Sequence, residues 1–173
     1  MVARSRGVDI LTEGSGNPGA SNVARVLGGR WGTLVFGLDA LKGGIPAVTG
    51  LAFDTRPGAY VLVAAAVLGH MFPVTRRFRG GKGVATMGGA MMVLHLLPSV
   101  VLLFVWILVR RTTGKASLAS ILITVGLPIG VAIAGSPGWE VGSVLALCGL
   151  VMFRHIDNIK RLLGGRELPA IHR

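Results

Sequence analysis

The chain has 173 residues, of which 51% are hydrophobic and only 14% are charged. A soluble domain carries about 25% charged residues, so the composition excludes an ordinary soluble protein. Apolar runs long enough to cross a bilayer predict an integral membrane protein instead. The net charge of +11 would indicate nucleic-acid binding in a soluble chain. Here the cations lie mainly between apolar runs, where the positive-inside rule accounts for them without nucleic acid.

Three further features narrow the class of protein. The single cysteine, Cys148, excludes an intrachain disulfide. The histidines are widely separated and no carboxylates cluster with them, so we expect neither a metal centre nor a cofactor. The first residues lack the apolar stretch of a secretory signal, and no internal repeat is visible, so we expect one domain over residues 1–173.

Residues 1–30 are a polar lead in which Gly, Ser, Asn and Pro concentrate over residues 14–22, a composition typical of turns. We expect Ser21 or Asn22 to cap a short helix that follows. Closely spaced uncharged donors, followed by Arg25, suit a ligand that carries phosphate or hydroxyl groups. A surface loop without a ligand is the alternative.

Apolar segments then cover residues 31–53, 59–74, 118–134 and 139–153, and a polar turn over residues 53–58 separates the first two. Only helices or closed barrels satisfy their backbone hydrogen bonds inside a bilayer. The segments therefore predict an all-α, polytopic helix bundle.

Asp39 and Lys42 interrupt the first apolar segment three residues apart, so they lie on one helical face. A charge inside a bilayer is costly unless it is paired or hydrated, and such residues usually face a functional interior. An ion pair that joins two helices is the alternative. Gly43 and Gly44 follow, and they predict a bend or a close contact between helices.

The stretch over residues 84–109 is apolar, and basic residues flank it at both ends. As one helix it would be about 39 Å long and would place the two basic flanks on opposite faces, against the positive-inside rule. Two full crossings need about 20 residues each and do not fit. We therefore expect a hairpin of short helices, bent near Leu97 and Pro98, beside a cavity lined by protein or water.

A glycine-rich basic loop over residues 76–86 precedes that hairpin, and the chain is organised around it. Its glycines let successive N–H groups turn inward as an anion site, and the start of the next helix favours phosphate. The expected phosphate ligands are Gly80, Gly81, Lys82, Gly83 and Thr86. A basic turn that only follows the positive-inside rule is the alternative.

The C-terminal stretch over residues 154–167 is amphipathic, with His155, Asn158 and Arg161 at helical spacing. An interfacial helix with its cations at the lipid surface is its simplest interpretation.

The expected hairpin brings the basic loops to one side of the membrane, with Lys42 and Arg56 as the exceptions. Residues 14–25, 76–86 and 154–167 then share that face. We expect these three polar segments to meet in one pocket at the membrane edge.

Three motifs in order resemble those of the bacterial acyl-phosphate-dependent glycerol-3-phosphate acyltransferases. They are residues 14–22, then residues 69–73 with 78–86, and finally residues 154–155 with 158–159 and 161–162. Asp39, Lys42 and the pair Ser117 and Ser120 also match, so the resemblance covers nearly the whole chain. It implies a multi-pass protein of the bacterial inner membrane whose active site faces the cytoplasm.

The resemblance implies transfer of a fatty acyl group from acyl phosphate to the 1-hydroxyl of sn-glycerol 3-phosphate, which gives lysophosphatidic acid and phosphate in the first step of phospholipid synthesis. Acyl phosphate is a mixed anhydride with a good leaving group. We therefore expect orientation of two anionic substrates and stabilisation of an oxyanion to dominate catalysis. A soluble enzyme that produces acyl phosphate is an expected partner.

The resemblance also implies residue roles. Arg25, Lys82 and Ser120 are expected to hold the glycerol phosphate, and Lys42 is expected to add charge. Ser15, Asn17, Asn22 and the amides of the glycine loop are expected to hold the acyl phosphate end. His155 and Asn158 are expected to orient the attacking hydroxyl or to polarise the carbonyl. The catalytic set is thus Ser15, Lys82, His155 and Asn158.

The sequence departs from that family at its start. Members usually begin with a transmembrane helix ahead of the first motif, and residues 3–9 resemble the end of that helix and the link that follows it. We expect that the sequence is truncated or that its start has been placed too far downstream. Ser21 stands where threonine is commoner, which keeps the hydroxyl.

Two other functions would use the same basic pocket. A transporter or channel for a phosphorylated solute would place Asp39 and Lys42 along its path, although the few full-length spans and the lack of inverted halves argue against it. A non-enzymatic scaffold on anionic lipid would leave Asn17, Lys82 and His155 unexplained. Acyltransferases that use thioesters typically carry His-x4-Asp, which this sequence lacks.

Overall fold

The structure is a computed structural model that describes residues 2–53 and 55–169; Asp54, in the turn expected after the first apolar segment, lies outside these ranges. Regular structure in the described part is entirely helical. The α-helices are α1 Ala20–Leu27, α2 Gly29–Phe53, α3 Arg56–Met71, α4 Val84–Leu94, α5 Leu96–Thr113, α6 Ala116–Ile133, α7 Gly138–Phe153 and α8 Ile156–Leu163. Short 3-10 helices lie at Arg4–Arg6 and Val74–Arg76.

Several of these helices are long enough to span a bilayer. By length and composition, α2, α3 with the turn that follows it, α5 and α6 are candidate spans, and α7 with α8 is a further candidate if the pair, bent by 60°, is taken as one. α4 is apolar but has only 11 residues, about 16 Å, which is roughly half of a bilayer core. The predicted all-α polytopic membrane fold is confirmed.

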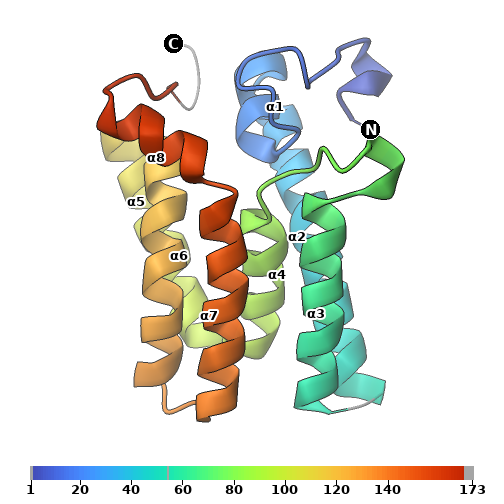
Figure 1. The fold of residues 1–173 in the computed structure, drawn as a ribbon, viewed down its shortest axis with the longest axis vertical. Helices are drawn as coiled ribbons and strands as arrows, with labels where there is room; N and C mark the ends of the chain where they lie inside the picture. The colour runs from blue at the N-terminus through green and yellow to red at the C-terminus, as the bar shows by residue number, and fades with distance from the viewer. Residues whose placement is uncertain (1, 54, 170–173) are drawn as a thin grey trace.

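The helices run alternately up and down the bundle, with the glycine loop, α1 and α8 at one end (Figure 1). α4 enters from that end and α5 returns to it, so the predicted hairpin over residues 84–109 is confirmed. The break lies at His95 rather than at Leu97 and Pro98, because the His95 backbone (φ −142°, ψ 68°) leaves the helical region. Pro98 is accommodated within the first turn of α5, where a missing N–H costs no helical hydrogen bond.

The short helix α4 is held against α2 by small residues. A Cβ atom at Gly43 would overlap the Thr86 carbonyl, and one at Gly89 would overlap the Ala40 carbonyl. The two backbones can therefore approach each other as closely as they do only because glycine stands at both crossing points. This confirms the close helix contact predicted at Gly43, and it fixes where the start of α4 lies.

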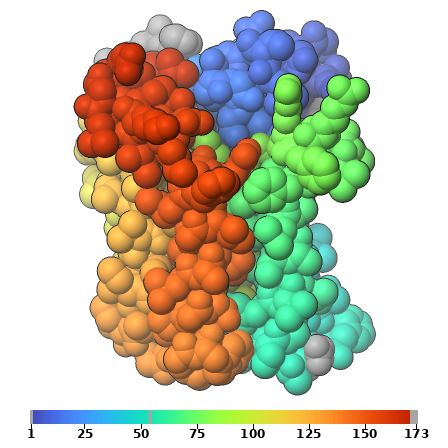
Figure 2. Space-filling view, viewed as in Figure 1, coloured from blue at the N-terminus to red at the C-terminus, as the bar shows by residue number. Residues whose placement is uncertain are grey.

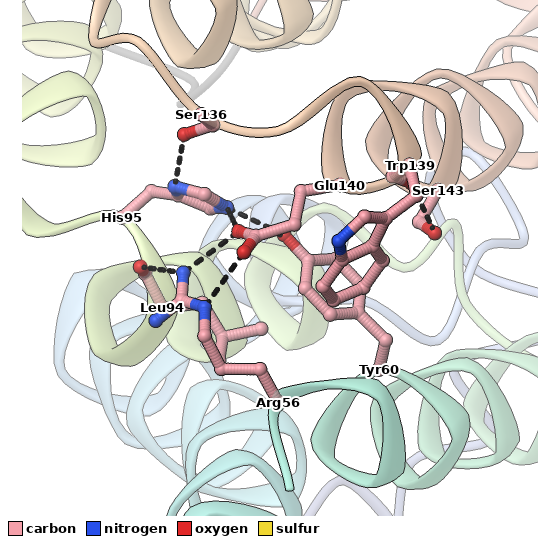
Figure 3. Close-up of polar contacts among 8 residues, drawn as sticks. All are labelled: Arg56, Tyr60, Leu94, His95, Ser136, Trp139, Glu140 and Ser143. Atoms are coloured by element: carbon pink, nitrogen blue, oxygen red, sulfur yellow. Dashed lines mark hydrogen bonds and ion pairs between the residues drawn. The ribbon is translucent and has the colours of Figure 1, made fainter.

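A polar cluster ties the other end of α4 to its neighbours (Figure 3). Arg56, at the start of α3, donates to both carboxylate oxygens of Glu140 on α7, each at 2.7 Å, and also to the carbonyl of Leu94 at 3.2 Å. The Tyr60 hydroxyl donates to Glu140 at 3.2 Å and lies 2.5 Å from Nε2 of His95. The carbonyl of Leu94 at the end of α4 and the side chain of His95 at the break before α5 thus both have polar partners inside the bundle.

Candidate functional site

A cavity of about 250 Å³ lies where the three polar segments meet. In Figure 2 the surfaces of the N-terminal segment, the loop before α4 and the α8 region adjoin at one end of the molecule. The polar residues that line the cavity are Ser15, Asn17, Ser21, Asn22, Arg25, Asp39, His70, Lys82, Ser99, Ser117, Ser120, Thr124, His155, Asn158 and Glu167. The structure therefore brings residues that are far apart in the chain around one space, as the sequence analysis expected.

The inner part of this cavity is apolar. Met91 and Met92 on α4, Leu102 and Leu103 on α5, and Leu127 on α6 line it. A polar, cationic mouth thus continues into a space among membrane-spanning helices. Such a space suits a ligand that has a charged head and a hydrocarbon tail.

The side chain of Asn22 is hydrogen-bonded within the polar lead and has no group left for a ligand. Its Oδ1 accepts from the Ser15 amide at 2.8 Å and from Arg25 at 2.9 Å, while its Nδ2 donates to the carbonyls of Glu13 at 2.9 Å and Ile10 at 3.3 Å. These four bonds use the full capacity of the side-chain amide, which is 1% exposed. The expected role of Asn22 as a direct substrate ligand is therefore replaced by one of holding Arg25 and the turns in place.

The expected cap of α1 is wrong. The helix begins after Gly19, which lies in extended backbone and supplies no side-chain cap, and Asn22 lies inside the helix. Ser21 lines the cavity instead of capping the helix. The turns over residues 14–19 are as predicted.

The glycine loop uses two of its amides internally. The Gly80 amide donates to the carbonyl of Met71, and the Gly81 amide to that of His70, both at 3.2 Å. A Cβ atom at either glycine would overlap His70. The amides of Gly80 and Gly81, expected to bind phosphate, therefore fasten the loop to the end of α3 and do not line the cavity.

Amides that could hold an anion lie a few residues later, at the start of α4. Gly83 has a φ of +83° and turns the chain into the helix, and Gly83, Val84 and Ala85 line the cavity. The first amides of a helix lack partners within it and carry its partial positive charge. They are the backbone donors of the loop that remain available to an anion.

Lys82 extends from the loop into the same space and donates through Nζ to Oδ1 of Asn158 on α8. Nδ2 of Asn158 donates to Glu167 at 2.9 Å, and Nε of Arg161 donates to the same carboxylate at 3.1 Å. Burial, reinforced by the charge of Arg161, lowers the pKa of Lys82 to about 8. The lysine is thus a cation near neutral pH whose charge is poorly solvated and would be stabilised by a bound anion.

His155 lies between α7 and α8 and is 2% exposed. Its Nδ1 lies 2.8 Å from the carbonyl of Val151, which can only accept, so Nδ1 carries the proton. Burial, with the neighbouring charge of Lys82, lowers the pKa of His155 to about 4. At neutral pH the ring is therefore uncharged, and its Nε2 is a hydrogen-bond acceptor.

Residues of α5 and α6 form another part of the cavity wall. Ser120 accepts a hydrogen bond from Nε1 of Trp106 at 3.1 Å, which leaves its own proton available to a ligand. The buried Ser117 hydroxyl has no hydrogen-bond partner within the described residues. Both serines line the cavity.

Two other residues assigned to substrate do not line the cavity. Lys42 is 57% exposed and pairs with Asp39 at 2.6 Å, while Asp39 itself is buried and lies 3.6 Å from His70. Thr86 is fully buried where α4 crosses α2. The sequence could not decide these positions, because the same helix has one face toward the cavity and another toward lipid or a neighbouring helix.

Comparisons with known proteins agree with this geometry. The sequence model of the family described as glycerol-3-phosphate acyltransferase matches residues 1–165. The glycerol-3-phosphate acyltransferase of Aquifex aeolicus is 42% identical over 96% of this chain and 88% of its own length. That of Actinobacillus pleuropneumoniae serotype 5b is 40% identical over 93% of this chain and 82% of its own length.

A crystal structure of PlsY (YgiH), an integral membrane glycerol 3-phosphate acyltransferase in its glycerol 3-phosphate form, superposes with a TM-score of 0.93, 39% identity, and coverage of 97% of this chain and 85% of that chain. Its lysophosphatidic acid form superposes with a TM-score of 0.90. This chain belongs to the glycerol-3-phosphate acyltransferase family. It is an integral membrane acyltransferase, and the transporter and scaffold alternatives lose their support.

Sequence reasoning missed three charged residues near the site of this acyltransferase. Glu167 accepts hydrogen bonds from both Arg161 and Asn158. Arg154 donates to the carbonyl of Gly80 at 3.0 Å, which holds the glycine loop against the end of α7. Arg154 and Arg161 lie within the third motif, but nothing in their spacing indicates these partners. Glu167 lies nine positions beyond Asn158, outside any helical periodicity that relates the two.

Proposed function

We propose that this acyltransferase transfers a fatty acyl group from an acyl phosphate to the 1-hydroxyl of sn-glycerol 3-phosphate. The products are lysophosphatidic acid and inorganic phosphate. The observation that carries the proposal is the single cavity that joins a cationic mouth, with Arg25 and Lys82, to an apolar interior around Met91 and Leu127. A phosphate-bearing acceptor fits the mouth, and an acyl chain fits the interior.

Two anionic groups must be held at the mouth. We assign the glycerol phosphate to Arg25, Lys82 and Ser120, which all line the cavity. The phosphate of the donor is assigned to the amides at the start of α4, with Ser15 and Asn17 completing that side. Each phosphate then meets at least one charged or helix-terminal donor, the kind of partner that anions bind most strongly.

Acyl transfer from an acyl phosphate needs little general acid catalysis, because phosphate is a good leaving group. The hydroxyl oxygen of the acceptor attacks the carbonyl carbon, the new ester C–O bond forms, and the bond from that carbon to the phosphate oxygen breaks. The hydroxyl proton leaves for the departing phosphate or for an acceptor nearby. Most of the rate enhancement then comes from holding both substrates in line and from donors aimed at the developing oxyanion.

His155 is assigned to orient the attacking hydroxyl. With Nδ1 bonded to Val151 and a pKa lowered to about 4, its Nε2 accepts and does not donate. An acceptor of this kind can hold the proton of the attacking hydroxyl, but it cannot polarise the carbonyl. Polarisation therefore falls to Lys82 and the amides of α4. His155→Ala should lower kcat by about tenfold to a hundredfold, and a preserved kcat would remove His155 from this role.

The mouth of the cavity is proposed to face the cytoplasm of a bacterial inner membrane. Arg25 belongs to α1, Lys82 to the loop before α4, Arg110 and Arg111 to the end of α5, and Arg154 to the end of α7. These elements meet at that end (Figure 1), and an excess of such residues marks the cytoplasmic side of a membrane protein. A soluble enzyme that produces acyl phosphate is the proposed source of the donor, because the long-chain anhydride must reach the mouth from the cytoplasm or the lipid surface.

The decisive experiment supplies detergent-purified protein with hexadecanoyl phosphate and radiolabelled glycerol 3-phosphate. We expect labelled lysophosphatidic acid and one equivalent of phosphate. Hexadecanoyl coenzyme A, given as the control donor, should yield no product. Product from the thioester alone, or uptake of label by proteoliposomes without any lipid product, would contradict the proposal.

A further inference from the structure

We propose that the loop over residues 74–79 binds the headgroups of anionic phospholipids, with its arginines at the lipid phosphates and its apolar side chains at the hydrocarbon boundary. None of residues 74–79 lines the cavity, and none has a role in the substrate assignments above. The surface is therefore separate from the site of acyl transfer, and the inference does not depend on the proposed function.

The position of this loop brings it to the depth of the headgroups. The loop follows α3, which ends at Met71, and the candidate span that contains α3 ends at Arg76. In Figure 2 side chains of the loop, drawn in green, project from the surface beside the N-terminal segment. The end of a membrane-spanning segment lies in the layer where headgroups meet hydrocarbon, so these side chains face that layer.

Arg76, Arg77 and Arg79 form a cationic patch without an acidic neighbour. The chain carries no Asp or Glu over residues 55–139. Within residues 2–53 and 55–169 the ion pairs are made by other side chains, and none of these three arginines joins one. Guanidinium groups of this kind bind phosphate oxygens through paired N–H donors, and adjacent cations attract an anionic membrane surface.

Val74 and Phe78 project from the same loop. Val74 is 77% exposed and Phe78 is 60% exposed. Phe78 has a φ of +62° and follows Arg77 at +50°, in the left-handed region that bulky side chains rarely adopt. The Phe78 amide donates to the carbonyl of Pro73 at 3.0 Å, which fixes this turn. A backbone that holds an aromatic ring outward against its own preference points to a partner that covers the ring.

The combination of side chains favours a lipid surface over a soluble protein as that partner. Aromatic rings concentrate at the boundary between hydrocarbon and headgroups, and long cationic side chains beside them reach the phosphates. The loop carries both kinds of side chain at the end of a span. An acidic protein would have to displace lipid phosphates from the same layer to reach these arginines.

The test places a fluorescent reporter in the loop. Phe78→Trp is reconstituted into vesicles of phosphatidylglycerol and phosphatidylcholine in equal amounts, with bromine on the acyl chains of one lipid or the other. The parent protein, with Trp31, Trp106 and Trp139, supplies the background to be subtracted. We expect the brominated lipids to quench the reporter, with a local preference for phosphatidylglycerol of about fivefold to tenfold. Val74→Trp is the second reporter if Phe78→Trp does not fold.

Charge variants in the reporter protein show whether the arginines cause the preference. Arg76→Gln, Arg77→Gln and Arg79→Gln together should reduce it to within about twofold of unity. High salt should weaken it in the unsubstituted loop, because salt screens exposed charges. The matched control removes the same charge from the turn between α5 and α6 and should leave the preference at residue 78 unchanged. Its substitutions are Arg110→Gln, Arg111→Gln and Lys115→Gln.

Three results would overturn the inference. Quenching of the reporter by acrylamide in the water, without quenching by either brominated lipid, would place the loop in solvent and favour a soluble acidic partner. Equal quenching by the two lipids would place the loop at the membrane surface without selectivity for anions. A preference that survives the triple glutamine substitution would not come from the arginines. The measurement needs no turnover, so failure of the parent protein to make lysophosphatidic acid would count against the proposed function alone.

Discussion

Two polar clusters lie at opposite ends of α4, and they differ in how completely their charges are paired. In the cluster around Arg56, one guanidinium meets one carboxylate through two hydrogen bonds, and Tyr60 and His95 add further bonds to the same network (Figure 3). In the cluster around Lys82, Glu167 pairs directly with Arg161 and only partly offsets the charges of Lys82 and Arg25.

This difference fits the proposal that the Arg56 cluster stabilises the fold and the Lys82 cluster binds substrate. A buried charge is tolerated where a partner and hydrogen bonds neutralise it. The Arg56 cluster meets that condition without any ligand. The cluster at the mouth meets it only in part, and the helix start beside it adds more positive character. A phosphate supplies the charge that is missing there.

Lys82→Met tests the cluster around Lys82 and should have the largest effect on activity. We expect kcat/KM to fall by about 10² to 10³-fold, the typical loss when an oriented donor to a developing negative charge is removed. The midpoint of thermal unfolding should stay the same or rise, because a poorly solvated buried charge is lost. Lys82→Arg should also be strongly impaired, since a planar guanidinium does not reproduce a point charge. A fall of less than about tenfold in Lys82→Met would contradict its assigned role.

Arg56→Met tests the cluster around Arg56 and should lower stability while leaving activity nearly unchanged. The free energy of unfolding should fall by about 3 kcal/mol, because Glu140, 3% exposed, loses its cation. Chemical denaturation in detergent measures this loss, while kcat/KM of the folded protein should stay within about twofold of the parent value. Arg56→Met combined with Glu140→Leu should recover most of the stability, because no unpaired charge is left. A loss of activity without a loss of stability would show that the comparison is wrong.

The pH profile sharpens the comparison by isolating the charge of Lys82. Below its pKa of about 8 the lysine is protonated and, in the proposed mechanism, binds phosphate; above that value it becomes neutral. We therefore expect kcat/KM for glycerol 3-phosphate to fall by about tenfold per pH unit above the pKa. The pKa of His155 is lowered to about 4, so this residue should cause no loss of activity until the medium is well below neutral. In Lys82→Arg any residual activity should lack the alkaline fall.

Of the four predictions, Trp106→Phe should show the smallest effect on the activity of the enzyme. It removes the donor that holds the Ser120 hydroxyl at 3.1 Å but keeps an aromatic ring in the cavity wall. A single neutral hydrogen bond contributes about 1 kcal/mol, so KM for glycerol 3-phosphate should rise by only a few-fold. Trp31→Phe is the matched control, because Trp31 stacks under Arg6 outside the cavity. Equal changes in both variants would argue against a role for Ser120.

The features that the sequence predicted correctly depend on local properties of the chain, whereas those that it missed depend on contacts between distant segments. The helix over residues 118–134, the short α4 and the amphipathic α8 follow from hydrophobic runs and charge placement, which are local properties of the chain. The hairpin also followed, since length and the positive-inside rule together excluded a single crossing. Only its break, at His95, was misplaced by about two residues.

The groups that are free to bind a ligand could not be predicted in the same way. Gly80 and Gly81 were the expected anion donors, yet their amides bond the end of α3, and the available amides belong to Val84 and Ala85. Asn22 was an expected ligand, yet its amide is fully used by the polar lead. Residue types in a motif indicate what a segment can bind, but not which of its groups remain unbonded after folding.

The sequence by itself determined that this is a helical membrane acyltransferase with three polar segments at one end, because hydropathy, cation placement and motif order are all written along the chain. Only the tertiary structure decided that Glu167 meets Asn158, that Arg56 meets Glu140, and that Thr86 is buried where α4 crosses α2. The physical reason is that a polar group binds a ligand only if no nearer partner has satisfied it. Those partners come from parts of the chain that are brought together by packing.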